Sequence, residues 1–451
     1  MLSSSPMNKP TRTRWKIAGL LCMAATVNYF QRVNISVAAD PMMKVFQLTQ
    51  TQMGSVFSAF LVGYMFFQIP GGMLADRFGP RRVLGWATLS WGLFTFLTGM
   101  ISTLAAVTGA SVLVALVALR FVFGISQGPM FPAGTRAVVN WFPLSERARA
   151  NGLCITGISI GSFLMPPLVS WMVLNLSWER SFYVAAVAAV LAAVAWGWYV
   201  RDHPSQHRAV NGAELSLIRR DASVVASPLL DFTVLKLQLC NGNLLRLVLS
   251  YTLNGYVSYV FVFWFYLYLV QVRHFGQAES AWLTTVPWIL AAVTTFGGGW
   301  LSDRLIATRL GMDWGRRIVP MTCQIGAALF MCLGARVENG YAAAGVLAVC
   351  TGLIMGVEGP YWATGNQISA KNVGFVGGLL NTGGNLGGVI SPTRTPLIAQ
   401  HFGWVRALDF AAVVALGAAA LWLTVIPSRK LEYDVSMPAS ALAVIDGPGS
   451  S

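Results

Sequence analysis

Charged residues are scarce in this 451-residue chain: Asp, Glu, Lys and Arg make up 11% of it, whereas hydrophobic residues make up 55%. A soluble fold of this length has too little interior to hide so much apolar surface. Apolar stretches of roughly 20 residues, the length that spans a bilayer as a helix, recur from one end to the other. The composition therefore excludes a soluble multidomain enzyme and predicts an integral membrane protein with the lipid bilayer as its solvent.

Acidic residues are rarer still, with 17 Asp and Glu against 31 Lys and Arg, which gives a formal net charge of +14. The basic residues gather in short segments between the apolar runs and do not mark one face, so we expect no nucleic-acid partner. Such clustering is typical of the cytoplasmic loops of membrane proteins. Its alternation along the chain predicts two cytoplasmic termini and an even number of spans, in a cell membrane that we expect to be a bacterial inner membrane.

Residues that hold metals or perform nucleophilic catalysis are few. The chain has four His and six Cys, with no CxxC or Cys/His ligand spacing, and it contains no nucleophile elbow or P-loop. We therefore expect no metal, no cofactor and no enzymatic activity, and we interpret the cysteines as packing residues. The polar, basic residues 1–16 precede an apolar run that continues to about residue 39 without a small-residue cleavage site, which predicts a retained first span.

Twelve apolar runs between residues 17 and 426 predict an all-α membrane protein of about 12 transmembrane helices. A polar segment that contains Pro204 and Pro228 separates the sixth run from the seventh. We predict an N-terminal six-helix bundle at 1–200, a cytoplasmic linker at 201–243, a C-terminal six-helix bundle at 244–430 and a disordered cytoplasmic tail at 431–451.

A repeated motif supports this division into halves. The segment GGMLADRFGPRR at 71–82 is echoed by GGWLSDRLIATRLGMDWGRR at 298–317, and each copy follows the second span of its half. Two similar bundles can rock about one central site, as alternating access requires. We predict that the motif forms a conformational latch on the cytoplasmic face, although a topology signal alone would also explain its charges. The expected latch residues are Gly72, Asp76, Arg77, Arg81, Arg82, Asp303 and Arg304.

Two arginines lie within predicted spans, Arg32 in the first and Arg120 in the fourth. An ionisable side chain inside a span costs about 2.5–3.5 kcal/mol on insertion scales, so it is a functional candidate by default. No acidic residue stands next to either arginine in this half, and a guanidinium fork matches the geometry of a carboxylate. We predict an electropositive pair that binds a substrate carboxylate. The alternative is a structural role in which the arginines hold helices together through backbone carbonyls.

Other polar side chains fall near the same depth. Tyr29 and Gln127 share helix faces with the two arginines, and Tyr64 lies in the second span, where either tyrosine could instead be a packed aromatic. In the C-terminal half, VEGPYWATGNQIS at 357–369 breaks a helix, and broken helices at membrane depth are tolerated where they line a cavity. The next span carries Asn381 and Asn385. The predicted substrate-binding residues are Tyr29, Gln31, Arg32, Tyr64, Arg120, Gln127, Tyr361, Trp362 and Asn381, with Glu358 as a candidate for coupling.

Four segments together resemble the major facilitator superfamily and, within it, the anion:cation symporter family. They are GGMLADRFGPRR, NYFQRVNISVA in the first span, RFVFGISQGPMFPAGTRAVVNWFPLSERARA from the fourth span onward, and GLLNTGGNLGGVISP in the eleventh. The resemblance implies a major facilitator fold of two pseudo-symmetric bundles and transport of a sugar acid or other carboxylate. It also implies that Arg32 and Arg120 match the arginines that bind the carboxylate, and that Tyr29, Tyr64 and Asn381 line the site.

The chain departs from this family at two positions. Many proton-coupled members carry an acid just before the first-span arginine and a glutamate seven residues after the fourth-span arginine, where this chain has Gln31 and Gln127. Glutamine cannot release a proton. Three mechanisms remain open: transport or exchange of the anion without a proton, a proton carried by Glu358 instead, or coupling to another cation. Glu358 could also balance the charge of an arginine structurally.

We expect a transporter, secondary active or facilitative, that moves a small organic anion by alternating access and functions as a monomer. The alternatives are an exporter of another class of small molecule, which the basic cavity disfavours, and an anion-binding membrane sensor. The sensor would signal through the segment at 201–243, which is short and carries no recognisable signalling domain.

Overall fold

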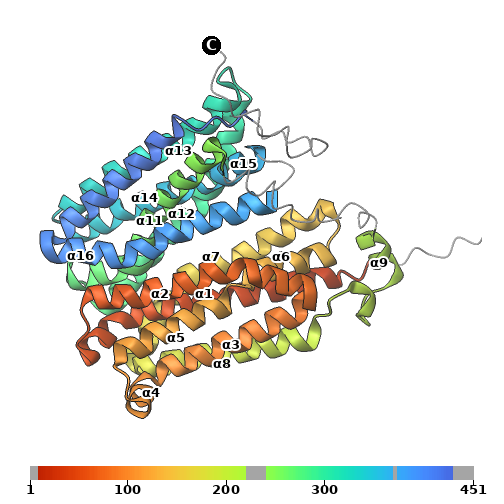
Figure 1. Ribbon diagram of the computed structural model, residues 1–451, viewed down its shortest axis with the longest axis horizontal. Helices are drawn as coiled ribbons and strands as arrows, with labels where there is room; N and C mark the ends of the chain where they lie inside the picture. Colours follow the sequence, from red (N-terminus) through yellow and green to blue (C-terminus); the bar gives the residue numbers. More distant parts are fainter. Residues whose placement is uncertain (1–8, 220–239, 369–372, 430–451) are drawn as a thin grey trace, which may run out of the picture.

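Helices account for all the regular secondary structure in the computed structural model, which describes residues 9–219, 240–368 and 373–429 and contains no strand within these ranges (Figure 1). The tail predicted at 431–451 and residues 220–239 of the predicted linker lie outside them. The elements are α1 Thr13–Phe46, α2 Gln50–Phe78, α3 Pro80–Gly99, α4 Ile101–Thr108, α5 Val112–Gln127, α6 Met130–Trp141, α7 Leu144–Asn175, α8 Trp178–Tyr199, a 3-10 turn Pro204–Gln206, α9 Gly212–Arg219, α11 Gly242–Gln271, α12 Gln277–Ile306, α13 Gly311–Arg336, α14 Gly340–Gly356, α15 Glu358–Ile368 and α16 Val373–Trp422.

The predicted set of about twelve spans is present. By length and composition, nine stretches of the described chain can cross a membrane, or ten when the bent pair α3 and α4 is counted as one span. Two of them combine consecutive helices, α5 with α6 and α14 with α15. The long α16 is in fact two helices, because the backbone turns at Gly403 (φ 82°, ψ 160°), a conformation that glycine adopts readily. Counting both parts of α16 and the more polar, 34-residue α1 gives twelve.

The helix ends follow local sequence signals. The Thr49 side chain accepts the N–H of Gln52 while the Gln52 side chain accepts the N–H of Thr49, so a capping box begins α2. Gly79 (φ 86°) ends α2 and Pro80 opens α3, which makes the tight turn of the first motif copy. Asn241 caps α11 in the second half by accepting the N–H of Leu244.

Two bundles with the same internal pairing make up the fold (Figure 1). In α1 to α8 the main contacts pair α1 with α7 and α2 with α5, and in α11 to α16 they pair α11 with α16 and α12 with α14. Glycines allow these helices to approach closely. A Cβ on Gly63 of α2 would lie 2.1 Å from the carbonyl oxygen of Phe121, and a Cβ on Gly298 of α12 would lie 1.9 Å from that of Gly356. The repeated pairing confirms the predicted pseudo-symmetric halves.

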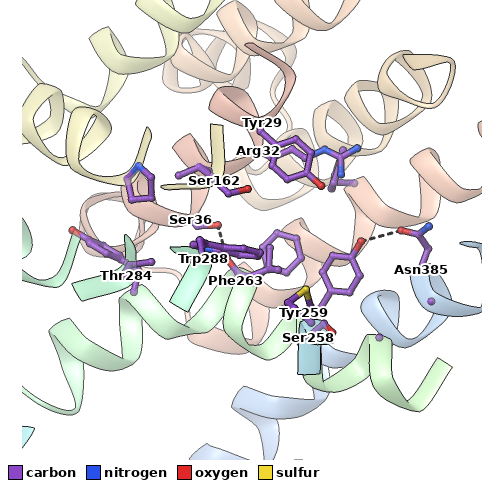
Figure 2. Close-up of a pocket in the computed structure, with 18 of the residues that line it drawn as sticks. Tyr29, Arg32, Ser36, Ser162, Ser258, Tyr259, Phe263, Thr284, Trp288 and Asn385 are labelled. Carbon is purple, nitrogen blue, oxygen red and sulfur yellow. Dashed lines mark hydrogen bonds between the residues drawn. The ribbon is translucent and has the colours of Figure 1, made fainter. Parts of the chain in front are cut away.

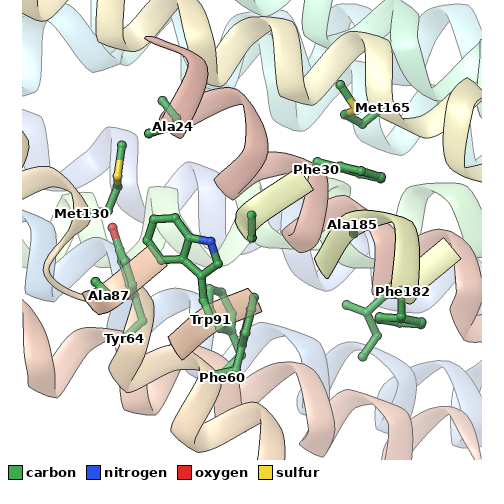
Figure 3. Packing of buried hydrophobic residues seen from close by; sticks show 14 of the residues in the cluster. Ala24, Phe30, Phe60, Tyr64, Ala87, Trp91, Met130, Met165, Phe182 and Ala185 are labelled. Atoms are coloured by element: carbon green, nitrogen blue, oxygen red, sulfur yellow. The ribbon is translucent and has the colours of Figure 1, made fainter. Parts of the chain in front are cut away.

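A continuous apolar core fills the N-terminal bundle. The fully buried indole of Trp91 belongs to the same cluster as Phe60, Tyr64 and Met130, which Figure 3 shows around it, and Phe182 and Ala185 of α8 extend the cluster along the bundle. Because Phe60 and Tyr64 also contact the first-span arginine described below, this core fixes one wall of the central site.

Contacts between the bundles are concentrated at one end of the molecule. We call the end that carries α9 and the start of α1 the linker end, and the opposite end the far end. At the far end, Gln50 donates to Gln271 (2.7 Å), which donates to Asp40 (2.9 Å), and Thr51 donates to Gln400 (3.0 Å). Along the interface of α2 and α16, Gly54 packs so closely that a Cβ would lie 2.1 Å from the carbonyl oxygen of Pro392. The bundles are therefore closed against each other at the far end and diverge toward the linker end (Figure 1).

The short linker helix α9 is attached to the N-terminal bundle through Glu214. This buried carboxylate accepts hydrogen bonds from the backbone N–H groups of Thr13 and Arg14 (both 3.1 Å) and from the Arg14 guanidinium (3.0 Å), and the same guanidinium pairs with Glu146 of α7 (2.7 Å). Burial alone would raise the pKa of Glu214, but these hydrogen bonds and one from Thr11 hold it below its usual value. Glu214 thus acts as a cap on the first turn of α1.

The repeated motif forms its ion pairs within each bundle. Asp76 pairs with Arg136 of α6 (3.4 Å) and forms no ion pair with Arg77, Arg81 or Arg82, the other charged residues of this copy in the expected latch. The Arg81 guanidinium instead donates to the carbonyl oxygen of Gly197 (2.6 Å), and its backbone N–H to Asp202 (2.9 Å). Sequence proximity could not indicate this partner, because Arg136 lies 60 residues further along the chain.

In the second copy of the motif the acid pairs within the motif itself. Asp303 contacts Arg316 (2.6 Å), which lies in the second turn of α13 and also donates to Ser302 (3.2 Å). Arg304 lies over the ring of Trp300 (4.4 Å), and a Cβ on Gly72 of the first copy would lie 3.3 Å from Pro132. The latch function of these residues remains a prediction.

Candidate functional site

A cavity of about 240 Å³ lies between the bundles near the middle of the molecule. Its walls come from α1, α2 and α7 of one bundle and from α11, α12, α14, α15 and α16 of the other. Figure 2 shows Tyr29 and Arg32 on one wall, with Tyr259 and Asn385 across from them. A ligand in this cavity would contact both bundles at once.

Arg32 is the cationic side chain that lines this cavity. Its Nε donates to Oε1 of Gln127 (2.9 Å), and its guanidinium carbon lies over the rings of Tyr64 (4.4 Å), Phe60 (5.0 Å) and Tyr29 (5.1 Å). Aromatic faces stabilise a cation in this way without neutralising its charge. Nη2 has no hydrogen-bond partner, and Arg32 belongs to no ion pair among the described residues. The guanidinium is therefore left with an unused donor and an uncompensated charge.

Arg120 lies behind this wall and does not line the cavity. It is 1% exposed, and its guanidinium lies over Phe123 (4.5 Å) and Phe60 (5.7 Å), so the ring of Phe60 contacts both arginines. Within the described residues its Nε and Nη1 have no hydrogen-bond partner and the side chain forms no ion pair. The two arginines therefore form the expected electropositive pair, but only Arg32 reaches the cavity.

The two glutamines take different positions from each other. Gln127 holds Arg32 from behind through the hydrogen bond already described. Gln31 is fully buried and donates to the carbonyl oxygen of Ala185 in α8 (3.1 Å), so its amide faces a neighbouring helix and not the cavity. Adjacent residues of a helix point about 100° apart, so only one of Gln31 and Arg32 can face the bundle axis.

The opposite wall carries the polar groups of the C-terminal bundle. Glu358 accepts hydrogen bonds from the Tyr251 hydroxyl (2.7 Å) and from Nε1 of Trp362 (3.3 Å). The Tyr259 hydroxyl donates to Oδ1 of Asn385 (3.0 Å), whose Nδ2 donates to the carbonyl oxygen of Asn381 (2.8 Å). Tyr361, also predicted to contact substrate, is fully buried behind this wall, where it bonds to Ser250 and Gln324.

Asn381 has a second role, because it links the two bundles. Its Nδ2 donates to Oε1 of Gln68 in α2. Gln68 lies ten residues closer to the linker end of α2 than Ser58, whose hydroxyl donates to the carbonyl oxygen of Val389 (2.7 Å). The Gln68–Asn381 hydrogen bond thus bridges the bundles on the linker side of the cavity.

Sequence reasoning missed the polar face of α11. Asn254 lines the cavity, is 1% exposed, and neither atom of its amide has a hydrogen-bond partner in the part of the chain that the structure describes. Tyr251, Ser258 and Tyr259 line the same cavity from the same helix. The spacing 251, 254, 258 could have revealed this face, because residues three and four apart share one side of a helix. Many aromatic residues surround these positions in the sequence, and they obscured the helical spacing of the polar residues.

The chain is similar over most of its length to known membrane transporters. The profile of the Major Facilitator Superfamily matches residues 21–363. A probable galactarate/D-glucarate transporter of Bacillus subtilis is 29% identical over 97% of this chain and 98% of its own length. A probable sulfoacetate transporter of Cupriavidus necator is 31% identical over 88% and 90%, and a D-galactonate transporter of Escherichia coli is 29% identical over 94% and 99%.

Solved structures share the fold at lower sequence identity. A bacterial homologue of the human lysosomal transporter Spinster, solved in an inward-facing and unoccupied conformation, superposes with a TM-score of 0.73 at 17% identity, covering 94% of this chain and 98% of that one. A D-xylose-proton symporter gives a TM-score of 0.72 at 14% identity, covering 92% and 98%.

Proposed function

Because the chain belongs to the major facilitator superfamily and is a membrane transport protein, we propose that it carries a small organic anion by alternating access, with Arg32 binding the substrate carboxylate. The observation that carries this proposal is the state of Arg32. It lines a cavity between the two bundles, uses only its Nε for hydrogen bonding to the described residues and has no ion-pair partner among them. A carboxylate is the group that supplies both the acceptor and the negative charge.

Arg120 supports an anionic substrate without touching it. Its charge lies behind Phe60, close to Arg32, where the low dielectric of the membrane interior strengthens electrostatic interactions. The positive potential in the cavity thus comes from two arginines, against the single carboxyl group of Glu358. A cation would be repelled from Arg32, which disfavours a cation exporter.

The C-terminal wall favours a hydroxylated acid. Amide and hydroxyl groups of Asn254, Tyr259, Asn381 and Asn385 face the cavity opposite Arg32, and each can donate to or accept from a sugar hydroxyl. Galactarate, glucarate and galactonate, which appear in the names of two of these relatives, are acids of this kind, whereas sulfoacetate has no hydroxyl group. We therefore propose a sugar acid as the substrate class and a small sulfonated or simple carboxylate as the second candidate.

The arrangement of the bundles supports alternating access. With the linker end on the cytoplasmic side, as the basic loops of the sequence favour, the far-end contacts close the outer side and the structure faces the cytoplasm. A substrate that contacts Arg32 on one bundle and the asparagines on the other would draw the bundles together. Its binding energy would then favour closure on the linker side, beginning at the Gln68–Asn381 hydrogen bond.

A thermal-shift comparison on the purified protein in detergent tests the proposal. D-galactonate, D-glucuronate, D-glucarate, tartrate, phthalate and sulfoacetate are each compared with a neutral sugar or ester counterpart. A ligand at about 100 times its Kd stabilises the state it binds by about 2.7 kcal/mol. We expect a rise in melting temperature with one class of acid and none with its neutral counterpart.

The Arg32→Ala variant is expected to lose this shift, because it removes the fork that the carboxylate binds. The matched control is Arg180→Ala, which removes an exposed arginine at the far end and should keep the shift of the wild type. A shift that persists in Arg32→Ala, or one of equal size with neutral counterparts, would reject the carboxylate site. No shift with any acid in the wild type would favour another substrate class or the sensor alternative.

A further inference from the structure

Glu358 occupies an unusual place in the cavity wall. It is the first residue of α15, directly after the break that separates this helix from α14, and it lies in the bundle opposite Arg32. The break is held against α12, because a Cβ on Gly359 would lie 3.0 Å from Cα of Gly299. The backbone that carries Glu358 is therefore fixed in position, and the carboxyl group projects into the space that a substrate would enter.

The two oxygens of this carboxyl group have different surroundings. Oε2 accepts both hydrogen bonds, from the Tyr251 hydroxyl (2.7 Å) and from Nε1 of Trp362 (3.3 Å). Oε1 accepts none from the described residues, and the side chain lines the cavity. A proton can therefore be gained or lost at Oε1 without disturbing the two hydrogen bonds that hold the side chain.

Glu358 also lacks a cationic partner. Asp40 pairs with Lys44 (2.8 Å), Asp303 with Arg316 (2.6 Å) and Asp409 with Arg336 (2.7 Å), whereas Glu358 takes part in none of the ion pairs that the described residues form. An ionised carboxylate inside a membrane protein is costly without such a partner. The neutral acid keeps its hydrogen bonds and avoids that cost, so both protonation states are accessible when the charge in the cavity changes.

The titratable groups around Glu358 come from three helices. Tyr251, Tyr259 and Tyr266 of α11 line the same cavity. The ring of Tyr361 of α15 packs at a tilt against Tyr251 (4.8 Å, 58°), and Tyr29 and Arg32 of α1 lie on the opposite wall. The cavity-lining residues of α12, α14 and α16 are threonine, tryptophan, methionine, glycine and asparagine, none of which ionises. Arg32 is therefore the cationic side chain that lines the same cavity as Glu358.

We propose that Glu358 carries a coupling proton, so that one proton accompanies each anion although positions 31 and 127 are glutamines. This inference rests on the proposed function and names its coupling ion. In the loaded carrier, the anion balances Arg32 while Glu358 is neutral. In the empty carrier, ionised Glu358 balances Arg32 across the cavity. Glu358 gains its proton at Oε1 from water on the loading side and returns it to water on the other side.

This charge balance explains why the two ligands would move together. A bound anion with an ionised Glu358 leaves one excess negative charge in the closing cavity, and an empty carrier with a neutral Glu358 leaves one excess positive charge. In both states closure of the bundles is unfavourable, because it removes the water that solvates the excess charge. Only the forms in which the charged groups lining the cavity balance one another complete the cycle. Arg120 lies behind the wall and is buried, so closure removes no cavity water from it.

Proteoliposomes test the proposal. They contain a pH-sensitive dye and are assayed with radiolabelled D-galactonate and D-glucuronate, two monovalent acids. An outside medium about one pH unit more acidic than the interior should drive about tenfold accumulation by the wild type if one proton accompanies each anion, since one pH unit corresponds to a factor of ten. We expect Glu358→Gln to lose this accumulation and its proton influx while it still exchanges labelled for unlabelled acid. Glu338→Gln, which removes an exposed acid at the far end, should behave as the wild type.

The outcomes separate this inference from the proposed function. If Glu358→Gln still accumulates acid, or if the wild type takes up acid without proton influx, the proton role is rejected while anion transport stands. Loss of both exchange and thermal stabilisation in Glu358→Gln would also reject it, in favour of a substrate contact or a structural role. If the wild type neither binds nor transports any acid, both proposals fail.

A second variant tests the carboxyl group without removing it. Tyr251→Phe deletes the stronger hydrogen bond to Oε2, which favours the ionised form. Half-maximal uptake should then occur at a more alkaline pH than in the wild type, with exchange retained. An unchanged pH profile in Tyr251→Phe would count against Glu358 as the proton carrier.

Discussion

At the scale of single residues, the two arginines of the site are surrounded by neutral side chains. Arg32 is held by a neutral amide and three aromatic rings, and Arg120 by two rings, with Phe60 common to both. Replacing the amide with an acid would add a counter-charge where none exists now. The identity of residue 127 therefore determines whether Arg32 is available to a substrate.

The Gln127→Glu variant should convert Arg32 into an ion pair, because its Nε already lies 2.9 Å from Oε1 of Gln127. The new carboxylate would compete with substrate, so anion affinity should fall at neutral and alkaline pH. It should recover as the pH falls and the new glutamate becomes protonated. Substrate-induced thermal shifts measured across a pH series would show this.

Gln31→Glu is the control, because Gln31 faces α8 and not the cavity. It should not produce the same pH-dependent affinity. An affinity in Gln127→Glu that does not vary with pH would show that Gln127 does not govern the charge on Arg32.

At the scale of elements, α9 is joined to α1 by one buried carboxylate. Glu214 caps the first turn of α1 and pairs with Arg14, and its pKa is held below the usual value, so the ionised form stabilises the folded state. That contribution is complete above the usual carboxyl pKa and is lost as the pH falls through the lowered one.

Glu214→Gln should therefore lower the melting temperature at neutral pH, by the equivalent of about 1.5–3 kcal/mol for hydrogen bonds to a charged group. The difference from the wild type should shrink in acid, when Glu214 itself becomes protonated. Ser216→Ala on the same helix, an exposed position, should leave the melting temperature unchanged. Equal melting temperatures for Glu214→Gln and the wild type at neutral pH would contradict this account.

The sequence predicted the elements better than their contacts. Hydropathy determines which segments enter the bilayer, so the twelve spans and the duplicated halves could be predicted. The rotation of each helix about its axis depends on packing against neighbours distant in sequence. For this reason Arg120 was expected in the cavity, no partner could be named for Asp76, and Asn254 was overlooked.

At the scale of the whole molecule, the far-end interface holds the bundles in one arrangement. Gly54 of α2 contacts the backbone at Pro392 of α16, where a Cβ would lie 2.1 Å from the carbonyl oxygen. Gly54→Trp should therefore wedge the bundles apart at this end and favour the opposite arrangement.

A cysteine introduced at Ser36, which lines the cavity, would report this change in membrane vesicles treated with an impermeant thiol reagent from the far side. Labelling should increase several-fold in Gly54→Trp relative to the Ser36→Cys parent. Gly19→Trp is a suitable control, because no atom lies within 4 Å of a Cβ at that position. Equal labelling with and without the wedge would show that this contact does not set the conformation.

The position of Phe60 between the two guanidinium groups has a consequence for the range of acids that the protein can accept. Arg120 acts on a ligand only at a distance, so it attracts any anion of suitable size and is insensitive to stereochemistry. Arg32 and the asparagines act by contact and depend on the shape of the ligand. Attraction of the anion and recognition of its shape thus depend on different residues. Substitutions among the residues that contact the ligand can therefore change the specificity while the buried charge of Arg120 is unchanged.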